Sequence, residues 1–164
     1  MDLQELLIKE LKLNHERTIR AFASVNPLWW RSAESGLKTN LNWQAGHMII
    51  SHYFHGIVSL KGSDEALKRS FDPKEYSKLY GMGSDPRENL DEKPGHEILI
   101  NNLEILDNRC IEIVSDMNES MLTEATVLDN PMAKTKYEAI FWSISHRMWH
   151  VGQVQLIKSH IQNA

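Results

Sequence analysis

Six apolar residues between positions 99 and 117 recur at intervals of four, three, four, three and four. They are Leu99, Leu103, Leu106, Cys110, Ile113 and Met117. This spacing lays one continuous apolar face along an α-helix, because the helix has about 3.6 residues per turn. A helix with such a face must bury it against other elements. The repeat therefore predicts a long helix, beginning after Pro94-Gly95, inside a larger helical assembly.

Three more segments have apolar residues at helical spacing, and they predict helices over residues 2–25, 42–60 and 136–161. Thr39 and Asn40 are suited to cap the start of the second helix, and Gly62 is suited to end it. Alternating β-branched runs between hairpin turns are absent from the sequence. We therefore expect an all-α fold, specifically a four-helix bundle.

The connection between the second and third helices, residues 62–94, is long and rich in turn-forming pairs such as Asp72-Pro73 and Asp85-Pro86. We expect short helical turns and irregular backbone there. A surface crossover between helices and a lid over a site are both consistent with such a loop.

A chain of 164 residues has the size of one ordinary domain, so we expect a single domain over residues 1–164. The net charge of −4 and the scattered Lys and Arg argue against a nucleic-acid partner. Charged residues interrupt the leucines of residues 1–13, which excludes a signal peptide or membrane span there and predicts a cytoplasmic protein without a membrane partner. Cys110 cannot form an internal disulfide, and its place in the apolar repeat predicts a small core residue.

Two of the eight histidines, His146 and His150, are four residues apart on the fourth predicted helix. Both imidazoles therefore project from one helical face, about one turn apart, where they can hold the same metal ion. An i, i+4 pair also arises by chance in a histidine-rich chain, so a metal site needs at least a third ligand.

The second predicted helix supplies the candidates for that third ligand. His47 ranks first, because its face continues through Ile50, Ser51 and Phe54 toward the interior of the bundle. His55 ranks well behind it, and His52, rotated away, is interpreted as a surface or packing residue. The other histidines are interpreted as lying on a helix surface, at a helix start and at a helix end; they are His15, His96 and His160.

Two strings of residues resemble a known family. His146-Arg147-Met148-Trp149-His150-Val151-Gly152-Gln153 has the pattern His-x-x-x-His-x-Gly-Gln, and Trp43-Gln44-Ala45-Gly46-His47 precedes it on the second helix. Together with the helix order, the loop placement and the length, they make the whole chain similar to the DinB-like superfamily. The resemblance implies a four-helix bundle that holds a divalent metal, often zinc or nickel, through three histidines, here His47, His146 and His150. It also implies relatives that use low-molecular-weight thiols as cosubstrates, and a homodimer.

Three neutral imidazoles with an open coordination position are typical of a catalytic metal site, since structural zinc sites usually close all four positions. Such a site can favour a metal-bound hydroxide or a thiolate. No carboxylate can be assigned as a general base, and Arg147 stands where a His-Glu-x-x-His metalloprotease has its glutamate, which excludes that class. Thiol transfer needs less from the protein and is favoured slightly over hydrolysis.

Several residues near the ligands keep two interpretations. The tryptophans Trp43, Trp142 and Trp149 either belong to the bundle core or line a pocket over the metal, and the core is the preferred interpretation. Gln153 is either a hydrogen-bond partner that orients an imidazole or, with Gly152, a site of close helix packing. Trp29-Trp30 either packs on the end of the bundle or makes a dimer contact.

Three functions therefore compete. The first is a metal-dependent enzyme acting on a small molecule, a thiol S-transferase or a hydrolase. The second is a metal-binding or stress-response protein without turnover, which the missing general base favours. The third is a degenerate bundle that serves as an oligomerisation scaffold, in which the histidines are packed polar residues and no metal binds.

Overall fold

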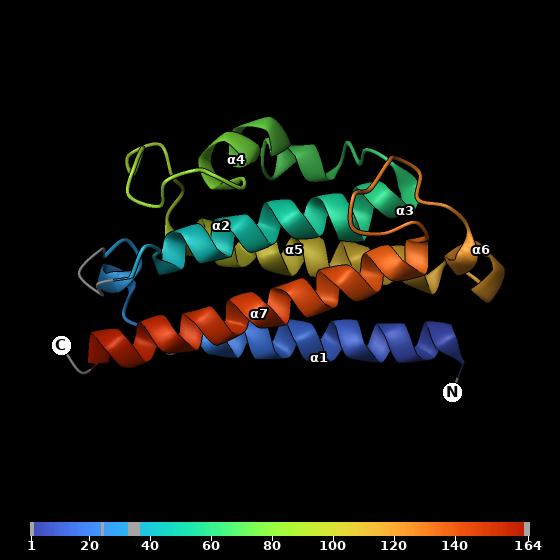
Figure 1. Cartoon of the computed structure of the whole chain (residues 1–164), viewed down its shortest axis with the longest axis horizontal. Coiled ribbons are helices and arrows are strands. Elements are labelled where there is room, and N and C mark those ends of the chain that lie inside the picture. Colours follow the sequence, from blue (N-terminus) through green and yellow to red (C-terminus); the bar gives the residue numbers. More distant parts are fainter. Residues whose placement is uncertain (1, 24, 33–36, 163–164) are drawn as a thin grey trace.

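The computed structural model describes residues 2–23, 25–32 and 37–162, and four long helices lie side by side in it (Figure 1). They are α1 (Leu3–Ala23), α2 (Leu41–His52), α5 (His96–Ser115) and α7 (Lys136–Gln162). Helix α1 packs against α5 and α7, and α2 packs against the same two helices from the other side. The described residues contain no strand, only an isolated bridge between Ala125 and Thr135. The expected all-α fold is confirmed.

Shorter helical pieces complete the fold. They are η1 (Pro27–Trp29), η2 (Tyr53–Val58), α3 (Ser59–Lys61), η3 (Leu67–Arg69), α4 (Pro73–Tyr80) and α6 (Glu119–Thr123). The second predicted helix is continuous from α2 through η2 to α3, but η2 is a turn of π-helix that the apolar spacing did not predict. Asn40 caps this helix by accepting from the backbone N–H of Trp43, and Gly62 ends it with a φ of 86°, as expected.

Helices α2 and α5 run in the same direction. At one end the Asn42 amide donates to the carbonyl of Pro94, and at the other the Cys110 thiol donates to the carbonyl of Gly56. The segment between them must therefore travel back along the bundle before α5 begins, which explains its length. It is a surface crossover, and α4 within it packs on α2 (Figure 1).

The apolar repeat of residues 99–117 is buried as predicted. Its first four members have no exposed surface, and Ile113 and Met117 are 6% exposed. Burial raises the pKa of the Cys110 thiol to about 12, so it is a core residue without the thiolate character of a nucleophile. Trp30 is buried against Phe22 with ring centroids 4.9 Å apart, while Trp29 stays 38% exposed.

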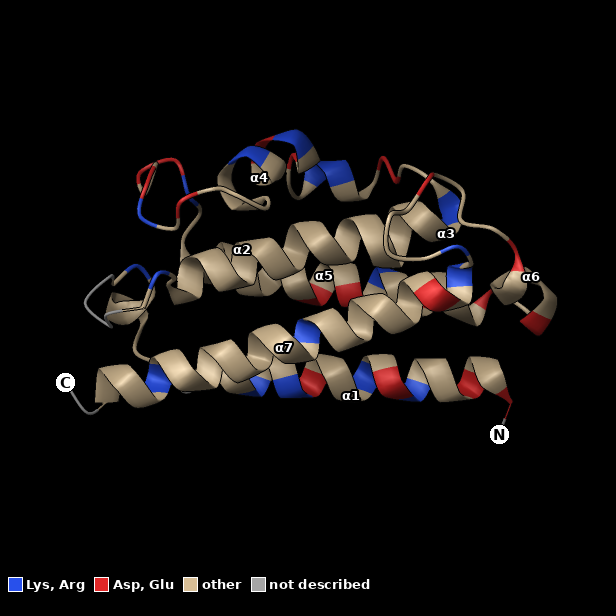
Figure 2. Cartoon of the chain, in the orientation of Figure 1, with Lys and Arg blue, Asp and Glu red and all other residues tan. Residues whose placement is uncertain are grey.

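The charged residues of the described chain are spread over several elements (Figure 2). Lys and Arg occur on α1, α5 and α7 but not on α2, and none of the long helices carries a continuous basic stripe. No helix in the described ranges has the length and apolarity that crossing a membrane requires.

Candidate metal centre

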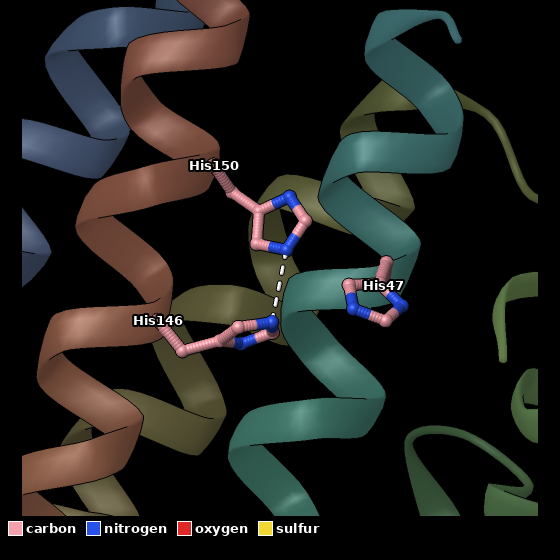
Figure 3. Close-up of side chains that lie close together, drawn as sticks. All are labelled: His47, His146 and His150. Atoms are coloured by element: carbon pink, nitrogen blue, oxygen red, sulfur yellow. Dashed lines mark hydrogen bonds between the residues drawn. The ribbon is translucent and has the colours of Figure 1, made fainter. Parts of the chain in front are cut away.

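Three imidazoles converge between α2 and α7 (Figure 3). His47 comes from α2, and His146 and His150 come from successive turns of α7. One nitrogen of each lies within 4.8 Å of the other two. The structure thus brings together the three residues that the sequence singled out.

Each of the three rings has its Nδ1 atom engaged by the protein. Nδ1 of His47 donates to the carbonyl oxygen of Tyr80 at 2.7 Å, and Nδ1 of His150 lies 2.6 Å from Oε1 of Gln44. Nδ1 of His146 lies 3.0 Å from the hydroxyl of Ser51. A carbonyl oxygen can only accept, so the neutral His47 ring carries its proton on Nδ1 and a lone pair on Nε2.

Gln44 is itself oriented by a second glutamine. Its amide nitrogen donates to Oε1 of Gln153 at 2.8 Å and to the hydroxyl of Thr39 at 2.9 Å. The amide oxygen of Gln44 is therefore turned toward His150, whose Nδ1 must donate to it. Of the two interpretations of Gln153, its contacts therefore support the orienting role. Gln153 orients the ring of His150 indirectly, through Gln44. Gly152 faces open space and packs against no helix in the described chain.

The glycine in the Trp-Gln-Ala-Gly-His string has a steric role. A Cβ atom on Gly46 would overlap the ring of Tyr80. Tyr80 is fully buried, and its hydroxyl donates to Oδ1 of Asn42 at 3.1 Å. The missing side chain at position 46 lets α4 approach α2 closely enough for the Tyr80 carbonyl to hold His47.

The facing nitrogens of α7 fit a shared cation. Nε2 of His146 and Nε2 of His150 are 3.1 Å apart. Ligand nitrogens at 2.0–2.1 Å from a tetrahedral zinc ion are separated by about 3.3 Å. Nε2 of His150 carries a lone pair, which leaves two arrangements for His146. Nε2 of His146 either donates its proton to that lone pair, or His146 donates from Nδ1 to Ser51 and turns a second Nε2 lone pair toward the same point.

The protonation state of the cluster also suits a cation. Burial, followed by the neighbouring imidazoles, lowers the pKa of His146 to about 4 and that of His150 to about 3. Burial lowers the pKa of His47 as well. The three rings are therefore neutral at pH 7, which is the form that binds metals.

Aromatic rings surround the imidazoles. Trp43 stacks on His47 with centroids 4.7 Å apart and an interplanar angle of 7°, and Trp142 stacks on His146 at 5.8 Å and 15°. Both tryptophans are partly exposed, so they flank the cluster as well as packing in the bundle. The core interpretation is wrong for Trp149, which is 59% exposed, because its position on α7 faces away from the other helices.

The remaining histidines of α1, α2 and η2 lie outside the cluster. His52 is buried, so it is a packing residue, with Nδ1 2.7 Å from the hydroxyl of Ser143. The surface interpretation of His15 is wrong, since its ring is only 27% exposed and its Nδ1 lies 2.6 Å from Oδ2 of Asp107. His55 is not one of the three converging residues.

The family model of the DinB superfamily matches residues 10–154, a range that includes all three clustered histidines. The chain belongs to the DinB superfamily. A crystal structure of a conserved protein from Enterococcus faecalis has a similar fold, with a TM-score of 0.76 and 15% sequence identity over 100% of this chain and 99% of that one. At this identity the likeness supports the DinB-like fold alone. No curated protein matches the chain.

Sequence reasoning missed three residues that hold the imidazoles of this DinB-like protein. Ser51, four residues after His47, was placed on its helical face but not as a partner of His146, and the same spacing could have placed Gln44, three residues before His47, on that face too. Tyr80 acts through its backbone carbonyl from the distant crossover, and no pattern in the sequence signals that contact.

Proposed function

We propose that this DinB-like protein binds one divalent cation through Nε2 of His47, His146 and His150 and uses it in an enzymatic reaction on a small molecule. The observation that carries the proposal is that the two nitrogens of each ring have different neighbours. Nδ1 is engaged by Tyr80, Ser51 or Gln44, and Nε2 faces the other two imidazoles, where one cation can bind all three rings. Metal-binding histidines typically have their second nitrogen held in this way.

Zinc and nickel are the ions that the family resemblance implies, and neutral imidazoles suit both. Three neutral ligands leave the full double positive charge of a bound cation in place, so that a thiol or water joining it loses its proton more readily. The protein's own part is to fix the three rings, with Trp43 stacked on His47 and Trp142 stacked on His146.

Thiol transfer is the reaction class that the site supports best. In the described chain no Asp or Glu hydrogen-bonds or ion-pairs with the three imidazoles, so the general base that hydrolysis normally needs has no candidate there. In the transfer, a thiol loses its proton to solvent and its sulfur forms a bond to an electrophilic carbon while the bond to the leaving group breaks. The substrates are a low-molecular-weight thiol and a small electrophile.

Elemental analysis of protein purified without an affinity tag tests the metal site. We expect about one equivalent of a divalent metal in the unaltered protein and loss of it in His47→Ala and His146→Ala. His160→Ala, at an exposed histidine near the end of α7, is the matched control and should keep the metal. Absence of metal in the unaltered protein, even after incubation with zinc and nickel, would refute the proposal.

A second candidate is a metal-binding protein without turnover. The missing carboxylate near the cluster favours it as well, because nothing in the described chain then moves a proton at the site. Metal-loaded protein that turns over no combination of thiols and electrophiles would support this candidate over thiol transfer.

A further inference from the structure

His55 lies beside the three-histidine cluster, on the π-helical turn η2 that continues α2. Its ring meets that of Trp142 edge to face at 6.4 Å, and Trp142 in turn stacks on His146 at 5.8 Å. Turns of π-helix are rare and occur frequently at functional sites. The ring of Trp142 therefore separates the half-buried His55 from the cluster, along the junction of α2 and α7.

Asn130, in the loop before α7, fixes which nitrogen of His55 carries the proton. Oδ1 of Asn130 accepts from the backbone N–H of Met132 at 2.9 Å, so its amide nitrogen must be the atom 3.0 Å from Nδ1 of His55. The same nitrogen donates to the hydroxyl of Ser59 at 2.8 Å, and that hydroxyl uses its own proton to donate to the carbonyl of Phe54. Nδ1 of His55 is thus an acceptor, and the proton of the neutral ring is on Nε2.

This arrangement is opposite to that of the clustered rings. His47 and His150 donate from Nδ1 and present a lone pair on Nε2. His55 accepts at Nδ1 and presents an N–H on Nε2, which has no hydrogen-bond acceptor among the described residues. A neutral ring in this tautomer cannot bind a metal through Nε2, but it can donate a hydrogen bond there.

We infer that His55 is a substrate-binding residue whose Nε2–H donates to an oxygen of the substrate. Trp142 then contacts the apolar part of the substrate, which lies between that oxygen and the atom bound at the cluster. The inference rests on the proposed function, because it assumes that the substrate is anchored at the three imidazoles. It assigns a substrate class: a thiol or electrophile that also carries a carboxylate or carbonyl oxygen at a distance from its reactive atom. Burial lowers the pKa of His55, in agreement with a neutral ring.

The tautomer can be observed directly by NMR. Correlations between the ring carbons' protons and both ring nitrogens distinguish a protonated nitrogen from one with a lone pair. We expect His55 to carry its proton on Nε2, and Asn130→Ala to reduce this preference to the modest one of a free neutral imidazole. A proton fixed on Nδ1 of His55 in the unaltered protein would overturn the inference.

The hydrogen bond itself can be tested in cobalt(II)-loaded protein, in which a bound thiolate has a visible absorption band. The probes are ω-mercaptocarboxylates of increasing chain length and the alkanethiols of the same length without the carboxylate. In the unaltered protein one chain length should bind roughly ten- to a hundredfold more tightly than its alkanethiol, the range expected of one hydrogen bond to a charged group. His55→Phe, which keeps a flat ring without nitrogens, should lose this advantage and keep the alkanethiol affinity.

Two further variants keep the test decisive. His55→Phe can also loosen the 126–132 loop, and His55→Gln addresses this, because it restores a donor and should recover part of the carboxylate advantage. His160→Ala is the control and should bind every probe as the unaltered protein does. Failure of the unaltered protein to bind cobalt or any thiol would refute the proposed function. Binding of both, with a carboxylate advantage absent or equal in all four proteins, would refute the role of His55 alone.

Discussion

The two nitrogens of each clustered imidazole have different surroundings, and this difference defines the site at the scale of single residues. Nδ1 meets a protein oxygen in every case, supplied by Tyr80, Ser51 and Gln44. Nε2 meets the other imidazoles. A ring held at one nitrogen loses little further freedom when the other binds a cation, so the oxygens prepare the site before any ion arrives.

Gln44→Leu tests this preparation, because leucine fills similar space but offers His150 no acceptor. We expect the affinity for zinc to fall about 10- to 100-fold with the three ligands intact. Competition with a chromophoric chelator measures the affinity, and Gln155→Leu, on the exposed side of α7, is the matched control. Equal affinities in the two variants would show that Gln44 does not prepare the ring.

At the scale of elements, the approach of α4 to α2 decides whether His47 is held. The ring of Tyr80 occupies the space that a side chain at position 46 would take, and the same residue provides the carbonyl that fixes His47. The crossover and the site are therefore coupled through one glycine.

Gly46→Ala should separate α4 from α2 and weaken both stability and metal binding. We expect a loss of roughly 1–3 kcal/mol in the free energy of unfolding, the range typical of overpacking, measured by urea denaturation with a chelator present. Gly152→Ala is the control, since nothing lies within 4 Å of the added methyl group. That variant should gain roughly 0.5–1 kcal/mol, because alanine favours a helix interior over glycine.

Spacing predicted the long elements well because it reports the buried face of a helix. The repeat from Leu99 to Ile113 lies in α5, with Met117 just beyond its end, and the pair His146 and His150 projects from one face of α7, as expected. The π-turn was not predictable in this way, because Tyr53–Val58 is apolar on several faces and an extra residue in one turn leaves no mark on the pattern. Nor does local spacing reveal that α5 runs parallel to α2, which depends on contacts distant in sequence.

At the scale of the whole molecule, one buried ionic cluster joins all four long helices. Asp107 of α5 lies 2.5 Å from Nη1 of Arg147 on α7, 2.6 Å from Nδ1 of His15 on α1 and 3.3 Å from Nε2 of His52 on α2. Burial by itself would raise the pKa of Asp107, but Arg147 and His15 outweigh it and the pKa is lowered. The carboxylate is charged at neutral pH and balances the buried guanidinium.

Asp107→Asn should destabilise the bundle strongly, because it leaves the Arg147 charge buried without a counter-ion. We expect a loss of roughly 3–5 kcal/mol, as for other buried pairs that lose one partner. Chemical denaturation measures it, with Glu104→Gln on the exposed side of α5 as the control. A loss below about 1 kcal/mol would mean that the cluster contributes little to stability.

The same cluster predicts a dependence of stability on pH. Burial lowers the pKa of His52 to about 3, from an ordinary value of 6.5, so the unfolded chain takes up this proton first as the pH falls. The contribution of His52 is retained above pH 6.5 and is lost progressively between pH 6.5 and about 3. Metal-free protein should therefore unfold at lower temperatures as the pH falls from 7 to 4.

His52→Gln should show a shallower decrease over that range, which thermal unfolding followed by circular dichroism can measure. His15 has the opposite sign, because its hydrogen bond to Asp107 raises its pKa and its contribution is complete below pH 6.5 and lost as the pH rises. Identical slopes for the unaltered protein and His52→Gln would exclude His52 as the titrating group.

Positions 47 and 146 are far apart in the order in which a ribosome makes the chain. Helices α1, α2 and α5 are translated first, and a nascent chain has a single one of the three ligands until α7 follows. The cluster is thus completed only by the last long helix, which also supplies the bundle's contacts with α1 and α2. A cation captured there would link the middle of α2 to the middle of α7 and mark the chains in which α7 has been both made and packed against α2.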